Sequence, residues 1–133
     1  DYEKLKKYVR DNSLEENVKF LGNVDNIPEF LNKIDICVVP SRSEGFGLAL
    51  VEAMAMGVPC IASNIAGPRE IISRTELGKL FESNDSDDLA NKLENMIVDF
   101  VSEKNIFWMM KDKIKNLYSI EKMCGELKNI YEN

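Results

Sequence analysis

Two short apolar runs on either side of a helix-forming stretch constrain the fold of this chain more than any other feature. Residues 34–40 read IDICVVP, and residues 58–63 read VPCIAS. Nearly continuous apolar runs of this kind are typical of strands that are buried on both faces of a parallel sheet. Between them, residues 48–56 read LALVEAMAM, which favours a helix, and Gly57 suits the end of that helix. A strand, a helix and a second strand predict a right-handed crossover unit.

The same alternation continues along the rest of the chain. In chain order, the further predicted elements are a helix over 2–11, a strand over 18–21, a helix capped by Asp25 or Asn26 with Pro28 in its first turn, a short helix that starts at Pro68, a strand over 78–82, and helices from Asp87 to Tyr131. Strands separated by helices predict an α/β fold, a Rossmann-like doubly wound parallel sheet with helices on both faces and additional C-terminal helices. Because such a sheet normally begins with a strand, we expect an element upstream of the first helix.

The charge balance argues against a nucleic-acid-binding surface. The chain carries 17 basic and 23 acidic residues, a formal net charge of −6, without a basic stripe. It contains no histidine, so the usual general base and the commonest zinc ligand are missing. Any chemistry must therefore use carboxylates, backbone groups or residues on another segment, and we expect no metal site.

The sequence also favours a cytoplasmic protein. No apolar run approaches the roughly 20 residues that span a bilayer, and the first residues lack the apolar segment of a signal peptide. Cys37, Cys60 and Cys124 lie far apart in the sequence, and two of them fall in apolar runs, which predicts buried reduced thiols. The lysines of the last thirty residues alternate with acids and predict solvated helix faces. Peripheral association with an anionic surface, such as the inner face of the plasma membrane, is the second option.

The loop over residues 41–47, SRSEGFG, follows the first apolar strand and leads into the predicted helix. In doubly wound sheets, ligands bind beyond the carboxyl ends of the strands, where such loops meet helix N-termini. Gly45 and Gly47 permit backbone torsions and close approaches that other residues resist. The free main-chain N–H groups of Gly47, Leu48 and Ala49 therefore predict a site for a phosphate group.

Two carboxylates flank this predicted phosphate site. Glu44 precedes the bend, and Glu52 lies about one helical turn inside the helix, roughly 6 Å further along its axis. Neither suits a phosphate, since like charges repel, but each can accept hydrogen bonds from a diol. A nucleotide-sugar, with a diphosphate between two sugars, matches this layout. The alternative is structural, because a glutamate near a helix N-terminus stabilises the helix dipole, and Glu44 would then have a capping role.

Other residues have both a binding and a structural interpretation. Arg42 and Arg69 could hold a phosphate, but exposed arginines near a loop are commoner than phosphate clamps. Phe46 could stack on a ligand or pack beneath the bend. The acidic pair at residues 87–88 fits a helix N-terminus better than a metal site. The run IFWMM, residues 106–110, fits a core or a domain interface better than a membrane-touching face.

Beyond these local patterns, residues 40–72, PSRSEGFGLALVEAMAMGVPCIASNIAGPREII, closely resemble the signature region of the retaining GT-B glycosyltransferases of the group-1 (family 4) class. The shared features are the two glutamates separated by seven residues, the EGFG bend, the EAMAMGVP helix end and a GxxE-like turn at Gly67–Glu70. The preceding segment VKFLGNVDNIPEFLNKIDICVVPS and the C-terminal segment YSIEKMCGELKNIY also resemble the family, although Ile120 stands where Trp is common. The resemblance covers nearly the whole chain.

The resemblance implies that residues 1–133 form part of the C-terminal, nucleotide-sugar-binding domain of a GT-B enzyme. Carried over position by position, it implies that the sugar donor is bound by Glu44, Gly45, Phe46, Gly47, Leu48, Ala49 and Glu52. Glu44 would contact hydroxyls of the transferred sugar at the catalytic centre, the main chain after it would hold that sugar and the diphosphate, and Glu52 would take the ribose diol. The base would lie near Gly22, Asn23 and Val24. The implied reaction transfers a hexose from an NDP-sugar, a UDP- or GDP-sugar first, to a saccharide or lipid-linked acceptor with retention of configuration and without a cofactor or metal.

The departures from the family pattern limit this expectation. Family members carry an upstream Arg and Lys that neutralise the departing diphosphate, as well as an N-terminal acceptor domain, and we expect both to be absent from this chain. LGKLF stands where an NGLL-like turn is common, and Arg69 replaces a commonly apolar residue. We therefore expect a fragment that does not turn over alone and that self-associates through exposed apolar surface. The alternative class is a non-catalytic Rossmann-like module that binds a nucleotide or a partner.

Overall fold

The computed structural model describes residues 1–119 of the chain. In chain order its elements are α1 (Tyr2–Asp11), α2 (Ile27–Leu31), β1 (Cys37–Val39), α3 (Leu48–Ala55), β2 (Cys60–Ser63), α4 (Ala66–Thr75), β3 (Lys79–Phe81), α5 (Ser86–Val98) and α6 (Phe100–Leu117). The three strands form one parallel sheet in the order β1-β2-β3. The predicted helix that continues to Tyr131, and Cys124, lie outside the described residues.

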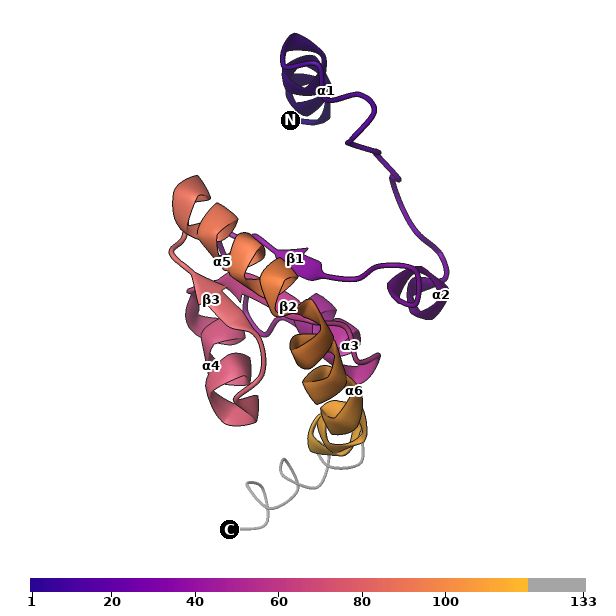
Figure 1. Ribbon diagram of the computed structural model, residues 1–133, viewed down its shortest axis with the longest axis vertical. Coiled ribbons are helices and arrows are strands. Elements are labelled where there is room, and N and C mark those ends of the chain that lie inside the picture. The colour runs from indigo at the N-terminus through magenta and orange to yellow at the C-terminus, as the bar shows by residue number, and fades with distance from the viewer. Residues whose placement is uncertain (120–133) are drawn as a thin grey trace.

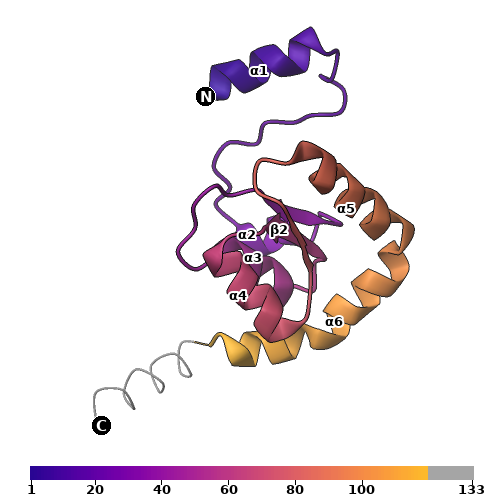
Figure 2. The same cartoon turned by 90° about the vertical axis from the view of Figure 1, so that its left-hand side faces the viewer.

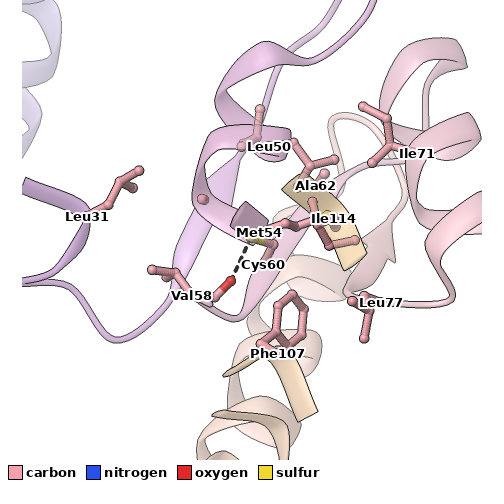
Figure 3. Close-up of a cluster of buried hydrophobic side chains, with 12 residues drawn as sticks. Leu31, Leu50, Met54, Val58, Cys60, Ala62, Ile71, Leu77, Phe107 and Ile114 are labelled. Atoms are coloured by element: carbon pink, nitrogen blue, oxygen red, sulfur yellow. Dashed lines mark hydrogen bonds between the residues drawn. The ribbon is translucent and has the colours of Figure 1, made fainter. Parts of the chain in front are cut away.

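Helices cover both faces of this sheet, as the α/β prediction requires (Figure 1, Figure 2). One face packs against α3, α4 and α6, and Leu50, Met54, Ile71, Phe107 and Ile114 are buried there in the main hydrophobic cluster (Figure 3). The other face packs against α5 in a smaller cluster. The strand-helix-strand unit predicted from residues 34–63 is therefore present, with the strands shortened at their ends.

The central position of strand β2 in the sheet explains why its residues are apolar without alternating with polar ones. All four of its residues are buried. Cys60 and Ala62 belong to the main cluster, whereas Ile61 belongs to the cluster under α5. Successive side chains of a strand point to opposite faces, so a central strand that is covered on both sides needs apolar residues at every position.

The predicted strand over residues 18–21 is wrong. This segment is extended but belongs to no sheet in the part of the chain that the structure describes. The N–H of Val18 donates to the carbonyl of Leu14, and the ring of Phe20 packs edge-on against Tyr2 of α1 with centroids 5.4 Å apart. Phe20 thus packs on α1, which stands away from the sheet in both ribbon views, whereas Leu21 is largely exposed.

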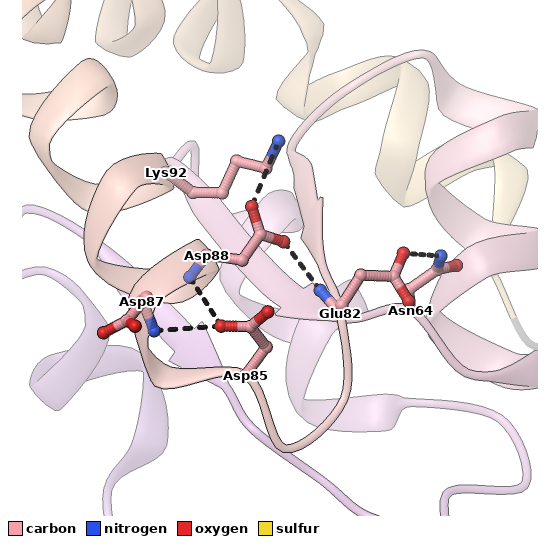
Figure 4. A network of polar contacts seen from close by, with 6 residues as sticks. All are labelled: Asn64, Glu82, Asp85, Asp87, Asp88 and Lys92. Carbon is pink, nitrogen blue, oxygen red and sulfur yellow. Dashed lines mark hydrogen bonds and ion pairs between the residues drawn. The ribbon is translucent and has the colours of Figure 1, made fainter.

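Polar side chains cap the starts of two helices, α2 and α5, and Figure 4 shows the cap of α5. The side chain of Asn26 accepts a hydrogen bond from the N–H of Glu29 at 3.1 Å and caps α2. The carboxylate of Asp85 accepts from the N–H groups of Asp87 and Asp88 at 3.0 and 2.9 Å and caps α5. The acidic pair at the start of α5 is therefore structural, as expected from its place in the first turn.

Helix α4 begins two residues earlier than predicted, at Ala66 instead of Pro68. The N–H of Arg69 donates to the carbonyl of Ile65 at 2.9 Å, which closes the first turn around Pro68. Proline lacks an N–H but is tolerated anywhere in the first turn, where that group has no partner inside the helix. The sequence rule that places proline at the first helical position was therefore too narrow here.

Strands β1 and β2 place two free thiols side by side. Cys37 and Cys60 are register partners, and Cys60 is buried while Cys37 is half-buried. The neighbouring thiol of Cys60 lowers the pKa of Cys37 from its ordinary 9.0, although burial acts in the opposite direction. Sγ of Cys60 itself donates a hydrogen bond to the carbonyl of Val58 at 3.0 Å. Burial is also the main reason why the pKa of Cys60 is raised well above 9.0. The two shifts have opposite directions, so the Cys37 thiol ionises at a lower pH than the Cys60 thiol.

We expect iodoacetamide to alkylate Cys37 before Cys60 in the native protein, because the thiolate is the nucleophile. A lowered pKa increases the thiolate fraction at a given pH, so the alkylation rate of Cys37 should reach half its maximum below pH 9.0. Mass spectrometry of peptides after timed quenching separates the two cysteines. The control Cys60→Ala should move the Cys37 profile to higher pH. An unchanged profile in that variant would contradict the effect of Cys60 on the pKa of Cys37.

Candidate functional site

The loop that joins β1 to α3 reaches the helix through a bend at Gly47. This residue has φ +102° and precedes the first helical residue. A side chain at this position would be strained, and its Cβ would also lie 3.2 Å from Cδ1 of Ile71. The bend therefore needs glycine for its torsion and for its close contact with α4.

The start of α3 leaves main-chain N–H groups open to a ligand. The N–H groups of Leu50 and Val51 donate to the carbonyl of Gly47 at 3.0 and 3.2 Å. No side chain caps the helix, unlike α5, and Leu48 and Ala49 are exposed. The first N–H groups of a helix have no intrahelical acceptor, so those of Leu48 and Ala49 can donate to an anion. The phosphate site itself stays a prediction.

Glu44 lies at the mouth of this bend and does not cap α3. Its Oε2 accepts a hydrogen bond from Oγ of Ser41 at 3.2 Å, in a half-buried setting. The helix start has no side-chain cap, so the structural alternative of a capping role for Glu44 is wrong. Ser41 instead holds the carboxylate by one of its oxygens and leaves acceptor capacity for a further partner.

Glu52 lies in the second turn of α3 and is exposed. No hydrogen bond or ion pair engages its carboxylate within residues 1–119. The two predicted carboxylates thus differ in setting. Glu44 is held by a neighbour beside the bend, whereas Glu52 stands free on the helix and can accept hydrogen bonds from a ligand.

Helix α4 packs closely against the bend at Gly67. A Cβ at Gly67 would lie 2.7 Å from the carbonyl oxygen of Phe46 and 3.0 Å from that of Gly45. These contacts involve backbone atoms, which cannot turn away as a flexible side chain does. The GxxE-like turn that the sequence showed at this position therefore has a packing reason, because only glycine lets the α4 start touch the bend.

The ring of Phe46 packs on the protein. It meets the ring of Tyr118, at the end of α6, edge-on with centroids 5.8 Å apart, and 41% of Phe46 remains exposed. Burial raises the pKa of Tyr118, Arg74 opposes that shift and Glu70 adds to it. Local sequence patterns did not indicate this contact with Tyr118, because it joins residues that are far apart in the chain.

The two arginines that were considered as phosphate clamps occupy different settings. Nε of Arg69 donates to Oδ1 of Asn64 at 2.7 Å, and Nη2 donates to the carbonyl oxygen of Asn64 at 2.8 Å. The structural interpretation therefore holds for Arg69. Arg42 is exposed and lines a hollow of about 320 Å³ at the carboxyl ends of the strands. None of the seven predicted sugar-donor residues lines that hollow.

Gly22, Asn23 and Val24 belong to the extended segment that leads into α2. Gly22 has φ +65°, and Val24 lines a separate hollow of about 200 Å³ beside α2. The placement of a base near these residues stays a prediction.

Residues 1–119 also show two general features that bear on function. They contain no group of three or more cysteine, aspartate or glutamate side chains arranged to hold a metal ion. None of the helices in this part of the chain combines the length and the apolar character that a membrane crossing requires.

Known proteins resemble this chain over most of its length. The sequence model of the family described as glycosyl transferases group 1 matches residues 1–107. The N-acetyl-alpha-D-glucosaminyl L-malate synthase of Bacillus anthracis is 32% identical over 123 residues, which cover 92% of this chain and 32% of that protein. The UDP-Gal:alpha-D-GlcNAc-diphosphoundecaprenol alpha-1,3-galactosyltransferase of Escherichia coli is 35% identical over 127 residues, which cover 93% of this chain and 32% of that protein. The chain thus spans about a third of the length of these relatives.

A solved structure agrees with the fold. Anabaena Alr3699/HepE, determined in complex with UDP, matches with a TM-score of 0.89 and 25% sequence identity. The match covers 98% of this chain and 36% of the Anabaena protein. The predicted Rossmann-like α/β fold is therefore confirmed.

Proposed function

The chain belongs to the glycosyl transferases of group 1, and from this premise we propose that it binds the nucleotide-sugar of a retaining hexosyltransferase. The observation that carries the proposal is the uncapped start of α3 between two carboxylates. Its open N–H groups suit a diphosphate, while Glu44 and Glu52 suit the polyol groups at the two ends of the ligand.

Each part of the ligand has a proposed partner. The main chain of Leu48 and Ala49 binds the diphosphate, and Glu52 accepts hydrogen bonds from the ribose diol. Glu44, held by Ser41, accepts hydrogen bonds from hydroxyls of the transferred sugar. The main chain at Gly45, Phe46 and Gly47 lines the other side of that sugar, and the base lies near residues 22–24. These assignments combine the geometry of α3 with the family resemblance.

A UDP-sugar is the first candidate for the ligand, and a GDP-sugar is the second. The Anabaena neighbour was solved with UDP, and the name of the Escherichia coli relative specifies UDP-Gal. In the proposed reaction, the bond between the sugar C1 and the diphosphate oxygen breaks, and a bond from C1 to an acceptor hydroxyl oxygen forms on the same face. The hydroxyl proton passes to the leaving diphosphate. No metal or cofactor is needed for this balance.

The acceptor, the pathway and the cellular location are proposed for the whole protein of which this chain is part. We propose a saccharide or lipid-linked acceptor, a role in polysaccharide biosynthesis, and an active site in the cytoplasm, with peripheral contact to the inner face of the membrane as an addition. The capsular polysaccharide glycosyltransferase CapM of Staphylococcus aureus, a relative that is 30% identical over 115 residues, supports this pathway class. An acceptor domain outside these residues would complete the site, and the chain alone should not transfer sugar.

Replacing Glu52 with alanine is expected to weaken UDP binding about tenfold or more, because a hydrogen bond to a charged group contributes about 1.5–3 kcal/mol. Isothermal titration measures the affinity. The matched control is Glu94→Ala, which removes an exposed glutamate from α5 and should leave the affinity unchanged. With 2′,3′-dideoxy-UDP, which lacks the diol, Glu52→Ala should have no effect. Equal affinity of the wild-type protein and Glu52→Ala for UDP would overturn the ribose assignment.

The alternative of a binding module without transferase activity is tested on the full-length protein. Sugar transfer from the UDP-sugar to a glycoside acceptor, with the product anomer assigned by NMR, supports the enzyme. Nucleotide binding without any donor hydrolysis or transfer would favour the alternative.

A further inference from the structure

Two cysteines lie next to each other at the amino ends of the neighbouring strands β1 and β2. Cys37 begins β1, Cys60 begins β2, and the two residues are partners in the parallel register. The main-chain N–H of Cys37 donates to the carbonyl of Pro59 at 2.8 Å, so the two backbones are hydrogen-bonded at this point. Hydrogen-bonded strands lie about 4.7–4.9 Å apart, within the range of about 4.4–6.8 Å between the Cα atoms of a disulfide. The backbone therefore holds the two residues at a distance that a disulfide can bridge.

The two cysteine side chains lie on the same face of the sheet. Cys60 is fully buried in the main hydrophobic cluster, and the half-buried Cys37 packs against that cluster. Their strand neighbours Val38 and Ile61 belong to the cluster under α5, on the opposite face. Successive side chains of a strand alternate between the faces, so register partners on one face are direct neighbours. The two sulfurs can therefore meet without a change of strand register.

The environments of the two thiols give them different roles in an oxidation. Cys37 is half-buried, so a small oxidant in solution can reach it, and the neighbouring Cys60 lowers its pKa. A lower pKa favours the thiolate, which is the form that oxidants attack. Cys60 has no exposed surface, and its Sγ donates to the carbonyl of Val58 (Figure 3). An oxidant therefore reacts first with Cys37, and Cys60 is the thiol next to the oxidised product.

We propose that Cys37 and Cys60 form a site of reversible oxidation, at which hydrogen peroxide converts the two thiols into a disulfide. The Cys37 thiolate attacks one peroxide oxygen, the O–O bond breaks, and a sulfenic acid forms while the departing hydroxide takes up a proton. The sulfur of Cys60 then attacks the sulfur of Cys37, the S–O bond breaks, and the departing hydroxide leaves as water with the Cys60 proton. The two thiols lose two electrons, and the peroxide is reduced to two molecules of water. A thiol reductant reverses the oxidation by thiol–disulfide exchange.

The disulfide encloses the segment over residues 37–60, which contains the bend and the whole of α3. Both cysteines lie at the amino ends of their strands, whereas the bend follows the carboxyl end of β1, so the bond includes none of the proposed sugar-donor residues. Closing a loop of this kind restricts the unfolded chain. We therefore expect the oxidised protein to unfold at a higher urea concentration than the reduced protein. The oxidation site is independent of the proposed function, because it depends only on the pairing of β1 with β2.

Peptide mapping after oxidation tests the proposal on the whole chain of 133 residues. The protein is exposed to hydrogen peroxide, unfolded, alkylated with N-ethylmaleimide and digested without reduction. Mass spectrometry should find a peptide pair joined through Cys37 and Cys60, and dithiothreitol should remove it. Cys124→Ala, which removes the third cysteine, should form the same pair at the same rate. In Cys60→Ala, dimedone should trap a sulfenic acid at Cys37, whereas Cys37→Ala should leave Cys60 reduced.

Several results would overturn the proposal, and circular dichroism before oxidation checks that each variant is folded. One is the recovery of both Cys37 and Cys60 as alkylated thiols after peroxide treatment of the wild-type protein. Another is a disulfide that joins either residue to Cys124 or to a second chain, or sulfinic acid at Cys37 without any crosslink. Equal rates of crosslinking in the native protein and in urea would show that the strands do not position the thiols. A crosslinked protein that unfolds at the same or a lower urea concentration would refute the stabilising effect. UDP titration of the reduced protein decides the proposed function separately.

Discussion

Gly67→Ala is expected to reduce the affinity for UDP by more than tenfold and to lower the free energy of unfolding by about 1–3 kcal/mol. The added Cβ would lie 2.7 Å from the carbonyl oxygen of Phe46 and 2.9 Å from its carbon. Because these atoms are backbone, either the bend or the start of α4 has to move. A displaced bend no longer presents Gly47 and the open helix start in the geometry that a diphosphate requires.

Two measurements on the same variant test this expectation. UDP titration reports the affinity, and urea unfolding followed by circular dichroism reports the stability. Gly45→Ala is the matched control for stability, because a Cβ at Gly45 meets no atom within 4 Å and its φ is not in the left-handed region. That control should change the free energy of unfolding by no more than about 0.5–1 kcal/mol. If Gly67→Ala unfolds and binds UDP as the wild-type protein does, the described contact between α4 and the bend is refuted.

Phe107→Ala is expected to lower the free energy of unfolding by about 3–5 kcal/mol, the usual cost of removing a large buried aromatic side chain. Phe107 is only 1% exposed and joins α6 to the main cluster that α3 shares (Figure 3). For a domain whose total stability is typically about 5–15 kcal/mol, this is a substantial fraction.

Denaturant titration of Phe107→Ala measures this loss, and a neighbouring methionine on the same helix provides the control. Met109 is 80% exposed, so Met109→Ala should change the free energy of unfolding by no more than about 0.5 kcal/mol. A loss below about 1 kcal/mol in Phe107→Ala would show that α6 does not pack on α3 as described.

The sequence predicted the centre of the fold because the relevant signals are local. The apolar runs around β1 and β2 and the helix formers of α3 each act within a few residues, and all three elements are present. The segment over 18–21 was mispredicted because a strand depends on a partner, and local propensity does not show whether one exists. Pro68 misplaced the start of α4 because proline fits any position of the first turn.

The local features of the candidate site could also be predicted from the sequence. The spacing of Glu44 and Glu52 around the bend, and the open start of α3, followed from neighbouring residues and are present in the structure. The contact of Phe46 with Tyr118 was not predictable, because it joins segments that only the folded chain brings together. What these residues bind stays a prediction that the experiments above decide.

The left-handed torsion at Gly47 has a consequence for how this chain can change during evolution. A side-chain cap in place of glycine would stabilise α3 by roughly a few tenths of a kcal/mol, but Ser, Thr and Asp are strained at φ +102°. Replacing Gly47 with a residue that has a capping side chain would therefore not stabilise the protein, so selection for stability alone would not favour it. The same torsion leaves the first amides of α3 without a side-chain cap, so the feature that makes the domain slightly less stable also keeps the proposed phosphate site open.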